Sequence, residues 1–383
     1  MSDTVSRALW LENRLDDRVS TAMEILVGAE SFWNRLDADI RAVQHEVCIQ
    51  MMTFEGDAVG HRVEDALIAV PHARRRILVD SFTRYVVSDR FRYSPGALRD
   101  PHHRREVAAT RLMFERLETE GAQVRFTNPV GPLFIRFPAR NHKKLVLIDR
   151  RIAYFGGFNF SDHNFAWHDL MVRCDDAEIA EFLHADFDAT WDGRARLIRG
   201  SFRSCDVHAL DGVTNEEGFR PILDLFVRAE RSITVVSPYL TFPFCEVLET
   251  ARRRGVHVTL VTPRDNNKLI VRDYLLWRAA RAGFDVRLFH GMSHMKAALV
   301  DDRRLVLGSS NFDFVSYRIE PEIVVVISAP EVIDSFRSQV LDRDLPTCTP
   351  LDHAPSTTRG IASLFALKAA DAASRVARRL GPR

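Results

Sequence analysis

One short pattern occurs twice in this sequence of 383 residues: a histidine, a lysine two positions later, and an aspartate five positions after the lysine. The copies are NHKKLVLID, with His142, Lys144 and Asp149, and SHMKAALVD, with His294, Lys296 and Asp301. Only 5 of the 53 basic residues are lysines, yet both copies keep one. Two chance matches are very improbable in a chain of this composition, so the chain carries two copies of one half-site.

The segments around the two copies also follow the same order. An asparagine lies 17 residues beyond each histidine, at Asn159 and Asn311. Before each copy, stretches with helical spacing of apolar residues alternate with short apolar stretches typical of strands. These are 58–71, 75–82, 103–120 and 122–128 in the first half, and 243–253, 257–263, 267–282 and 284–290 in the second. The alternation predicts an α/β fold with two similar lobes, each a mixed sheet flanked by helices, packed about a pseudo-twofold axis.

The repeat also predicts the domain boundaries. We expect an N-terminal extension at 1–27, a first lobe at 28–200, a second lobe at 201–350 and a tail at 351–383. The tail combines an apolar helical face with several cations: Ile361, Leu364, Phe365, Ala369, Ala372, Val376 and Leu380, beside Lys368, Arg375, Arg378 and Arg379. This helix either lies on an anionic membrane surface or packs on the protein's own core, and the pattern fits both.

The bulk composition limits the classes of function. A formal net charge of +1 gives no overall basic field, which makes nucleic acid an unlikely partner. The five cysteines are widely spaced in apolar surroundings, which predicts reduced core residues of an intracellular protein. The N-terminus lacks the apolar segment of a signal peptide, and no run of 18 apolar residues predicts a transmembrane helix. Work on lipid would therefore take place at a membrane surface.

Side-chain parity indicates what each half-site can do. Side chains two apart on a strand share a face, so each motif histidine points the same way as its lysine. The motif aspartates fall on the opposite face, where we expect them to stabilise the following turn. Small polar residues after each hairpin can bind an anionic oxygen: Asn159, Ser309 and Asn311. A carboxylate follows on the next strand, Asp169 or Glu322, and could orient an imidazole by accepting from Nδ1.

Two half-sites brought face to face would form a pocket with two histidines and two lysines. Such a pocket suits a phosphodiester: one imidazole attacks phosphorus, lysines and asparagines stabilise the charged oxygens, and the other imidazole protonates the leaving alcohol. The intermediate is a phosphohistidine, which passes to an acceptor hydroxyl or to water. The reaction requires no cofactor, and the sequence shows no cluster of histidines and carboxylates with metal-ligand spacing.

These motifs resemble the phospholipase D superfamily, in which HxKxxxxD occurs twice, and more closely its bacterial cardiolipin synthase branch. The resemblance covers about residues 28–345 and includes GHRVEDALIAV, Gly156-Gly157-x-Asn159, Trp167-His168-Asp169 and GSSNFD. It implies two phospholipase D-type lobes, a catalytic set that contains all six motif residues, and phospholipid substrates. The implied reaction moves a phosphatidyl group onto histidine and then to phosphatidylglycerol, with release of a small alcohol.

The resemblance further implies roles and a location. Family habit makes His142 the nucleophile and His294 the general acid, in an enzyme bound peripherally to the cytoplasmic face of the cell membrane. The chain departs from the branch at Glu320, where asparagine is common, and this bears on acceptor specificity. Two alternatives use the same residues: hydrolysis of phospholipids, and a metal-independent nuclease or phosphodiesterase.

The segment before the first motif is apolar, with cations interleaved. Residues 130–138 could line an opening for acyl chains, with Arg136, Arg140 and Lys143 as a cationic rim, or they form a buried loop with a few solvated cations.

Overall fold

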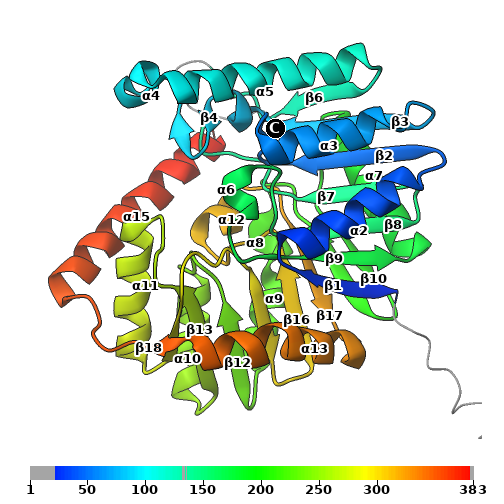
Figure 1. Cartoon of the computed structure of the whole chain (residues 1–383). Coiled ribbons are helices and arrows are strands. Elements are labelled where there is room, and N and C mark those ends of the chain that lie inside the picture. Colours follow the sequence, from blue (N-terminus) through cyan, green and yellow to red (C-terminus); the bar gives the residue numbers. More distant parts are fainter. Residues whose placement is uncertain (1–21, 132–133, 135, 380–383) are drawn as a thin grey trace, which may run out of the picture.

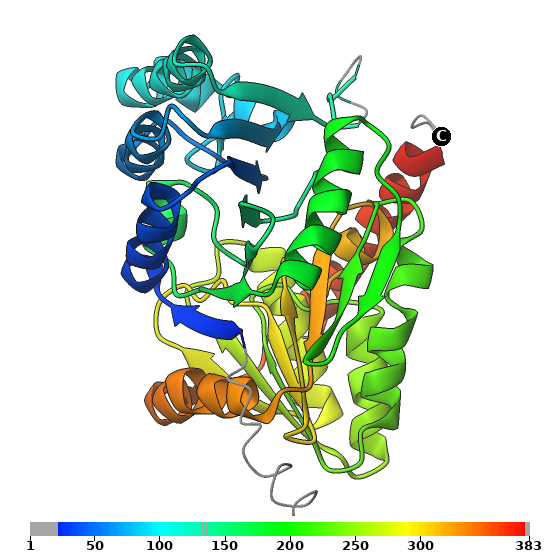
Figure 2. The same cartoon turned by 90° about the vertical axis from the view of Figure 1, so that its right-hand side faces the viewer.

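The protein folds into two α/β lobes, each built on one mixed sheet (Figures 1 and 2). The structure is a computed structural model and describes residues 22–131, 134 and 136–379. All statements below concern that part of the chain.

The first lobe is a seven-stranded sheet with α-helices packed on both faces. Its strands are β1 (Met23–Val27), β2 (Glu46–Met51), β3 (Arg74–Asp80), β6 (Gln123–Thr127), β7 (Leu145–Ile148), β8 (Ile152–Gly156) and β9 (Leu170–Asp175). They pair in the order β1-β9-β8-β7-β2-β3-β6. The main helices are α2 (Ala29–Arg41), α3 (Ala58–Ile68), α5 (Pro101–Thr119) and α7 (Ala177–Trp191). Shorter elements are the strands β4 (Val86–Val87) and β5 (Arg90–Phe91) and the helices α4 (Pro95–Arg99) and α6 (Asp162–Phe165).

The second lobe is a nine-stranded sheet of the same design. Its strands are β10 (Ile198–Ser201), β11 (Cys205–Ala209), β12 (Ser232–Val236), β13 (His257–Pro263), β14 (Asp285–Phe289), β15 (Ala297–Val300), β16 (Arg304–Gly308), β17 (Ile323–Ile327) and β18 (Thr349–Pro350). They pair in the order β10-β11-β17-β16-β15-β12-β13-β14-β18. Its helices are α8 (Asn215–Gly218), α9 (Arg220–Arg228), α10 (Phe244–Arg253), α11 (Leu269–Ala282), α12 (Phe314–Arg318), α13 (Pro330–Phe336), α14 (Asp342–Asp344) and α15 (Thr357–Arg379).

The two sheets share one topology. The run β1-β9-β8-β7-β2-β3-β6 corresponds strand by strand to β11-β17-β16-β15-β12-β13-β14. In both, the last three strands are parallel and the others antiparallel. The predicted fold class, two similar lobes with mixed sheets and flanking helices, is confirmed.

Aspartates begin three of the first-lobe helices. Asp57 accepts a hydrogen bond from the Gly60 amide at the start of α3, and Asp100 and Asp176 do the same for the first amides of α5 and α7. An N-cap of this kind typically stabilises a helix by about 1 kcal/mol. The caps explain where these helices begin.

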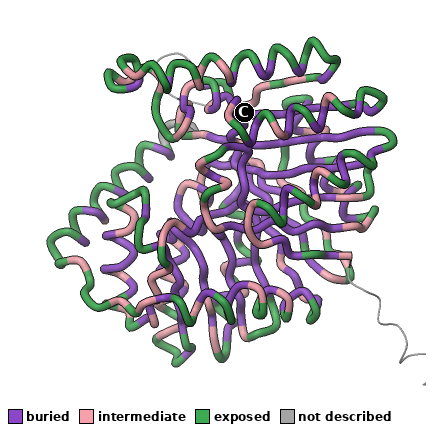
Figure 3. Tube along the Cα trace, in the orientation of Figure 1, coloured by how far each residue is buried: buried purple, intermediate pink, exposed green. Residues whose placement is uncertain are grey.

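Apolar side chains form three layers of core. One lies between the sheets and includes Val172, Phe187, Val325 and Phe336, from β9, α7, β17 and α13. The second covers the outer face of the first sheet under α2, α3 and α5, and the third covers the second sheet under α9, α10, α11 and α15. Figure 3 shows the strands buried and the outer helices exposed on one side. Each fully buried side chain of this size contributes about 1.5–3 kcal/mol, so the central layer holds the lobes together.

The element boundaries differ in two places from the domain boundaries expected from the sequence. Strand β1 pairs with β9 in the first sheet, although its residues fall within the expected extension. Strand β10 spans position 200 and pairs with β11 in the second sheet. Residues 1–21 of the expected extension lie outside the described residues. No described helix is long and apolar enough to cross a membrane.

The tail helix α15 packs along α11 at the edge of the second lobe (Figure 1). Leu367 is buried in the second-lobe core, and Asp371 pairs with Arg318 at 3.2 Å. Gly360 lies so close to the Trp277 indole that an added Cβ would approach a ring atom to 2.1 Å. One face of the helix therefore packs on the protein itself.

Of the apolar face identified in the sequence, Leu364 lies on this packed side, against the second-lobe core. Ile361 and Phe365 are exposed, with 40% and 71% of their surface accessible. Leu380 and the Val376 side chain lie outside what the structure describes. Helix α15 therefore packs on the protein with one side and exposes the apolar side chains of Ile361 and Phe365 on the other.

Candidate active site

The two motif histidines line one cavity between the lobes. Each lies just before a central strand, His142 before β7 and His294 before β15, and each is 6% exposed. The cavity has a volume of about 160 Å³, and Asn159 and Asn311 also line it. His142 and His294, which are 152 positions apart in the sequence, therefore lie in one cleft.

Each histidine is held by the lobe to which it does not belong. His142 Nδ1 lies 3.0 Å from a Glu322 oxygen, and His294 Nδ1 lies 2.9 Å from an Asp169 oxygen. The backbone repeats the exchange: the His142 amide donates to the Pro321 carbonyl at 3.0 Å, and the His294 amide to the His168 carbonyl at 2.8 Å. The sequence suggested that each of these carboxylates orients an imidazole, without showing which one. The structure places both carboxylates at the imidazole of the other half.

The carboxylate of Glu322 is fixed on all sides. The hydroxyls of Ser309 and Ser316 both donate to it, Ser316 at 2.7 Å. Burial acts to raise the pKa of Glu322, but His142, Lys144 and the Ser309 hydroxyl outweigh it and hold the pKa below its usual value. Ser309 was expected to bind substrate phosphate, which stays a prediction; in the structure its hydroxyl donates to Glu322.

In the first half, the carboxylate that holds the imidazole is Asp169, and no serine hydroxyl donates to it because Gly157 lies at the corresponding position. A Cβ on Gly157, the counterpart of Ser309, would lie 2.2 Å from the Asp169 carboxylate. Only glycine therefore fits where Asp169 reaches across to His294. Asp169 itself accepts the Leu170 amide at 2.8 Å.

Both motif lysines are fully enclosed in the site. Lys144 Nζ donates to the His142 carbonyl at 2.8 Å, and Lys296 Nζ lies 2.7 Å from His294 Nδ1. Burial lowers the pKa of Lys144 to about 7 and that of Lys296 to about 8. An anionic phosphate in the cavity would stabilise their charged forms, so charge on the lysines is coupled to the binding of such a group.

Burial also keeps both imidazoles neutral. It lowers the pKa of His142 to about 4, against the opposing charge of Glu322. Burial and the charges of Lys296 and Lys144 hold the pKa of His294 well below its usual value. A neutral imidazole whose Nδ1–H is bound to a carboxylate keeps a free lone pair on Nε2.

The two asparagines differ in their surroundings. Asn159 is held by its neighbours, because its Oδ1 accepts from the Thr53 amide at 3.3 Å and its Nδ2 donates to Asn164 at 3.1 Å. Asn311 Oδ1 is buried and finds no partner among the described residues. Both amides remain candidates for contact with a phosphate oxygen.

Comparison with known proteins assigns the family. A family model described as cardiolipin synthase, PLD-like domain, matches residues 36–191 and 222–344. The chain belongs to this phospholipase D-like family. The recognition made from the two motifs is thereby confirmed.

Relatives and solved structures agree with this assignment. Minor cardiolipin synthase ClsB of Bacillus subtilis (strain 168) is 27% identical over 261 residues, which are 61% of this chain and 63% of that protein. Cardiolipin synthase A of Salmonella arizonae is 25% identical over 377 residues, 86% of this chain and 72% of that protein. The match thus spans less than two thirds of ClsB. The phosphatidylserine synthase of Haemophilus influenzae has the same fold, with a TM-score of 0.69 and 16% identity over 92% of this chain and 94% of its own.

The aspartates of this phospholipase D-like motif do not line the cavity. Asp149 accepts the backbone amides of residues 44–46 at 2.7–2.9 Å, and Asp301 accepts those of residues 230–232 at 2.7–3.0 Å. Both have positive φ, 51° and 52°, at the start of a hairpin turn. They were counted with the catalytic set; the structure assigns them to the turns that hold the central strands in register.

Sequence reasoning missed several residues of the cavity. Lys268 lies 4.1 Å from the centroid of the Tyr239 ring, and both line the cavity with Trp167. The scarcity of lysine was a usable signal, because three of the five lysines, Lys144, Lys268 and Lys296, gather at this phospholipase D-like site.

Two groups of described side chains could offer three ligand atoms to a metal. They are Glu46, Cys48 and His184, and His142, Glu320 and Glu322. Arg76 already binds in the first group, at 3.2 Å from Glu46, and the Lys144 ammonium interacts with both carboxylates of the second. A protein cation therefore competes with any ion at each place.

Proposed function

We propose that this protein transfers a phosphatidyl group from one phospholipid to a hydroxyl of phosphatidylglycerol, in the manner of a cardiolipin synthase. The group passes through a phosphohistidine, and a small alcohol is released. The cardiolipin synthase relatives, at 25–27% identity, support this reaction type. The observation that carries the choice of a lipid substrate is an apolar cavity beside the two histidines.

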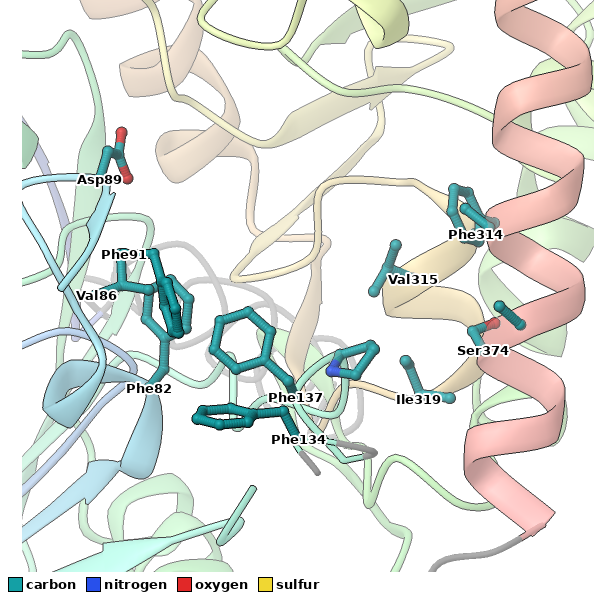
Figure 4. A pocket seen from close by; sticks show the side chains of 13 residues that line it. Phe82, Val86, Asp89, Phe91, Phe134, Phe137, Phe314, Val315, Ile319 and Ser374 are labelled. Carbon is teal, nitrogen blue, oxygen red and sulfur yellow. The ribbon is translucent and has the colours of Figure 1, made fainter. Parts of the chain in front are cut away.

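This acyl cavity has a volume of about 1030 Å³ and lies between the lobes and the tail helix (Figure 4). Phe82, Val86 and Asp89 line both it and the cavity of the two histidines. Its other walls are Phe91, Phe134, Phe137, Pro138, Phe314, Val315, Ile319, Ala370, Ala373 and Ser374. Figure 4 shows Phe82 and Phe91 facing Val315 and Ile319 across the space.

The walls fit acyl chains better than they fit nucleotides. Burial of apolar surface contributes about 25 cal/mol per Å², which acyl chains exploit and a sugar-phosphate chain does not. A nucleic acid would need cations along a groove. The expected cationic rim is reduced, because Lys143 is buried in a pair with Asp186 at 2.7 Å and Arg140 stacks on Phe137 at 3.8 Å. The same segment supplies Phe134 and Phe137 to the acyl cavity, in line with the opening expected from residues 130–138.

A product analysis tests the proposed function against its alternatives. Purified protein is incubated with phosphatidylglycerol vesicles and, separately, with single-stranded DNA. We expect diphosphatidylglycerol and free glycerol from the vesicles. Phosphatidic acid without the diphosphatidyl product would indicate hydrolysis, and cleavage of DNA with intact lipid would indicate a nuclease; either result contradicts the proposal.

Filling the acyl cavity should select against long chains. We expect Ala373→Phe to lower kcat/KM for long-chain phosphatidylglycerol by about 10-fold or more, while activity on a dibutanoyl analogue changes little, because the new ring occupies space that only long chains need. Initial rates with the two lipids in detergent measure this. Ala369→Phe, on an exposed part of α15 outside the cavity lining, is the matched control. Equal losses on both lipids would show that the cavity does not hold acyl chains.

We also propose that the protein docks on the cytoplasmic face of the membrane through its exposed apolar residues. Aromatic residues at the acyl cavity, Phe91 and Phe134, are 36% and 39% exposed, and neighbouring Tyr93 is 50% exposed. Ile361 and Phe365 add an outward stripe on α15. Exposed aromatic and apolar groups beside a lipid-binding opening suit an interface. The five cysteines are all buried and free, which supports a reducing compartment.

A paired substitution on the tail tests this docking. We expect Ile361→Ser/Phe365→Ser to lower binding to anionic vesicles about 10-fold, because two exposed apolar side chains no longer enter the interface. Activity on detergent-solubilised lipid should stay near that of the unaltered protein. Val227→Ser, which removes an exposed apolar residue from α9, is the control for vesicle sedimentation. Unchanged binding would exclude the tail from the docking surface.

A further inference from the structure

Part of the wall of the cavity of the two histidines is polar but lies outside the repeated motif. Three of its side chains come from the first lobe: Glu55 after β2, Asp89 between β4 and β5, and His163 in α6. Two come from the second lobe, Asn267 and Lys268, directly before α11. We call these five residues the rim cluster. Both lobes thus supply the cavity with hydrogen-bonding groups that the reaction at phosphorus does not use.

Asp89 is the carboxylate of the rim cluster that is open to a ligand. Asn267 Nδ2 donates to Asp89 Oδ2 at 3.3 Å, and the Tyr239 hydroxyl donates to Asn267 Oδ1 at 2.5 Å. These bonds cross from one lobe to the other and hold the carboxylate at the cavity. Asp89 Oδ1 lies 3.9 Å from His163 Nε2, beyond hydrogen-bonding distance, and 54% of the side chain is exposed. This oxygen can therefore accept from a hydroxyl of a substrate.

Glu55 is enclosed, and its carboxyl is mostly neutral at pH 7. Only 2% of its surface is exposed, and its Oε2 accepts the Ser88 amide at 3.0 Å. Burial raises the pKa of Glu55 to about 8, against the effect of the Ser88 hydrogen bond. A protonated carboxyl donates one hydrogen bond and accepts others, so it can bind a hydroxyl without attracting a cation.

A buried acceptor in the same cavity lacks a donor. Asn311 is 5% exposed and lines the cavity, and its Oδ1 has no partner among the described residues. A buried acceptor without a partner is unfavourable. A phosphodiester oxygen cannot donate to it, whereas a hydroxyl can. This favours a ligand that carries a hydroxyl group close to the phosphate.

Charge and size limit which alcohol can bind. Burial and then the charges of Lys296, Lys144 and Lys268 lower the pKa of His294, so these three ammonium groups lie near the reacting centre. Lys268 Nζ forms no ion pair with a described residue and lies 4.1 Å from the centroid of the Tyr239 ring. An ammonium headgroup would meet like charges here. The cavity volume of about 160 Å³ is below the roughly 300–1,000 Å³ of pockets for drug-sized ligands, which indicates a small, uncharged alcohol.

We propose that the rim cluster, together with Asn311, is a subsite for a small vicinal diol, the glycerol headgroup of the lipid. This rests on the proposed function and names the residues that recognise the alcohol. In the transfer step the acceptor oxygen bonds to phosphorus as the bond from phosphorus to histidine breaks, and its proton passes to the other imidazole. The acceptor oxygen enters where the leaving oxygen departed, so one subsite serves both the released glycerol and the acceptor glycerol.

Competition between two alcohols tests the subsite. The donor is short-chain phosphatidyl-p-nitrophenol in detergent, whose leaving group has no vicinal hydroxyl for the rim cluster to bind. 1,2-Propanediol and 1-propanol, which differ by one hydroxyl, compete at equal concentration, and mass spectrometry measures both phosphatidyl products. We expect the unaltered protein to favour the diol by about 10-fold or more, because the subsite pairs with the second hydroxyl.

Asp89→Asn should remove most of this preference while p-nitrophenol release stays unchanged. Asparagine tolerates the positive φ of 56° at this position. Its amide oxygen can keep the bond from Asn267, which places the NH₂ group where the open carboxylate oxygen was, so a charged acceptor is lost. Asp265→Asn, an exposed carboxylate outside the cavity lining, is the matched control.

Two substitutions separate binding by Glu55 from support of the fold. Glu55→Gln keeps a neutral group that donates and accepts, so the diol preference should stay within about 3-fold; Glu55→Leu removes both functions and should lower it about 10-fold. Release of p-nitrophenol should be unchanged in both. A fall in release as large as the fall in preference would show that Glu55 only supports the cavity.

The remaining outcomes separate this subsite from the proposed function. Equal amounts of both products from the unaltered protein, or an unchanged product ratio in Asp89→Asn, would overturn the subsite and leave the proposed function standing. Faster transfer to ethanolamine than to the diol would also overturn it, because the cluster would then select an amino alcohol. Absence of p-nitrophenol release and of any phosphatidyl alcohol would instead refute the proposed function.

Discussion

Replacement of Glu322 by glutamine is expected to lower kcat for phosphatidyl transfer by about 10⁴-fold, the scale found when a carboxylate that orients a catalytic imidazole is made neutral. Glu322 accepts from His142 Nδ1 at 3.0 Å and is otherwise held by Ser309 and Ser316. The amide has almost the same shape, but it offers no charge to the imidazolium and can turn its NH₂ toward Nδ1. Initial rates with short-chain phosphatidylglycerol in detergent measure the loss.

A second glutamine variant on the same lobe gives the comparison. Glu331→Gln changes an exposed carboxylate at the start of α13 and should leave kcat unaltered. Thermal unfolding of both variants should match that of the unaltered protein to within a few degrees. A large rise in KM with little change in kcat for Glu322→Gln would contradict an orienting role, because such a role acts in the transition state.

Replacement of Asp186 by leucine should destabilise the protein by about 3–5 kcal/mol, because it strands a buried charge. Lys143 lies between the two site residues of the first motif but points the other way, and both Asp186 oxygens lie 2.7 Å from its Nζ. Neither side chain is more than 1% exposed. Urea unfolding followed by circular dichroism measures the loss.

The second lobe supplies the design of the rescue. The counterpart of Lys143 in the second motif is Met295, which is fully buried in the central core layer. Lys143→Met/Asp186→Leu should therefore recover most of the lost free energy of unfolding, because an apolar pair of similar volume replaces the ion pair. If the double variant were as unstable as Asp186→Leu alone, the shape of the site, and not the stranded charge, would be the cause.

Much of the fold could be predicted from the sequence. The helical stretches at 58–71, 103–120 and 267–282 correspond to α3, α5 and α11, because each has apolar residues at helical spacing and an adjacent strand to cover. The repeat of motif and asparagine spacing predicted the shared topology of the two sheets. The strands β1 and β10 were missed because they are short edge strands, whose pairing depends on neighbours far along the chain.

The candidate site was only partly predictable. Spacing pointed to His142 and His294 through the repeated motif, and to Asp169 and Glu322 through their offsets of 27 and 28 residues from these histidines. It did not show that the carboxylates are exchanged between lobes, because local offsets carry no information about how two sheets pack across an axis. The contact of Ser309 with Glu322 was not predicted either: it joins the ends of the neighbouring strands β16 and β17 within one lobe, and the spacing of the motifs does not reveal which strands pair.

The exchange of carboxylates makes each lobe dependent on the other for a working imidazole. Either lobe produced alone would expose its share of the central core and leave its histidine without a partner, so the smallest active unit is the pair. Two identical lobes would contribute identical residues to the cavity. When both lobes are encoded in one chain, the residues of each lobe can change independently. Trp167 and Glu320, at corresponding positions of the two lobes, are a difference that a pair of identical lobes could not hold in one cleft. Joining the halves in one chain therefore lets the two sides of the cavity differ, which exact twofold symmetry would not allow.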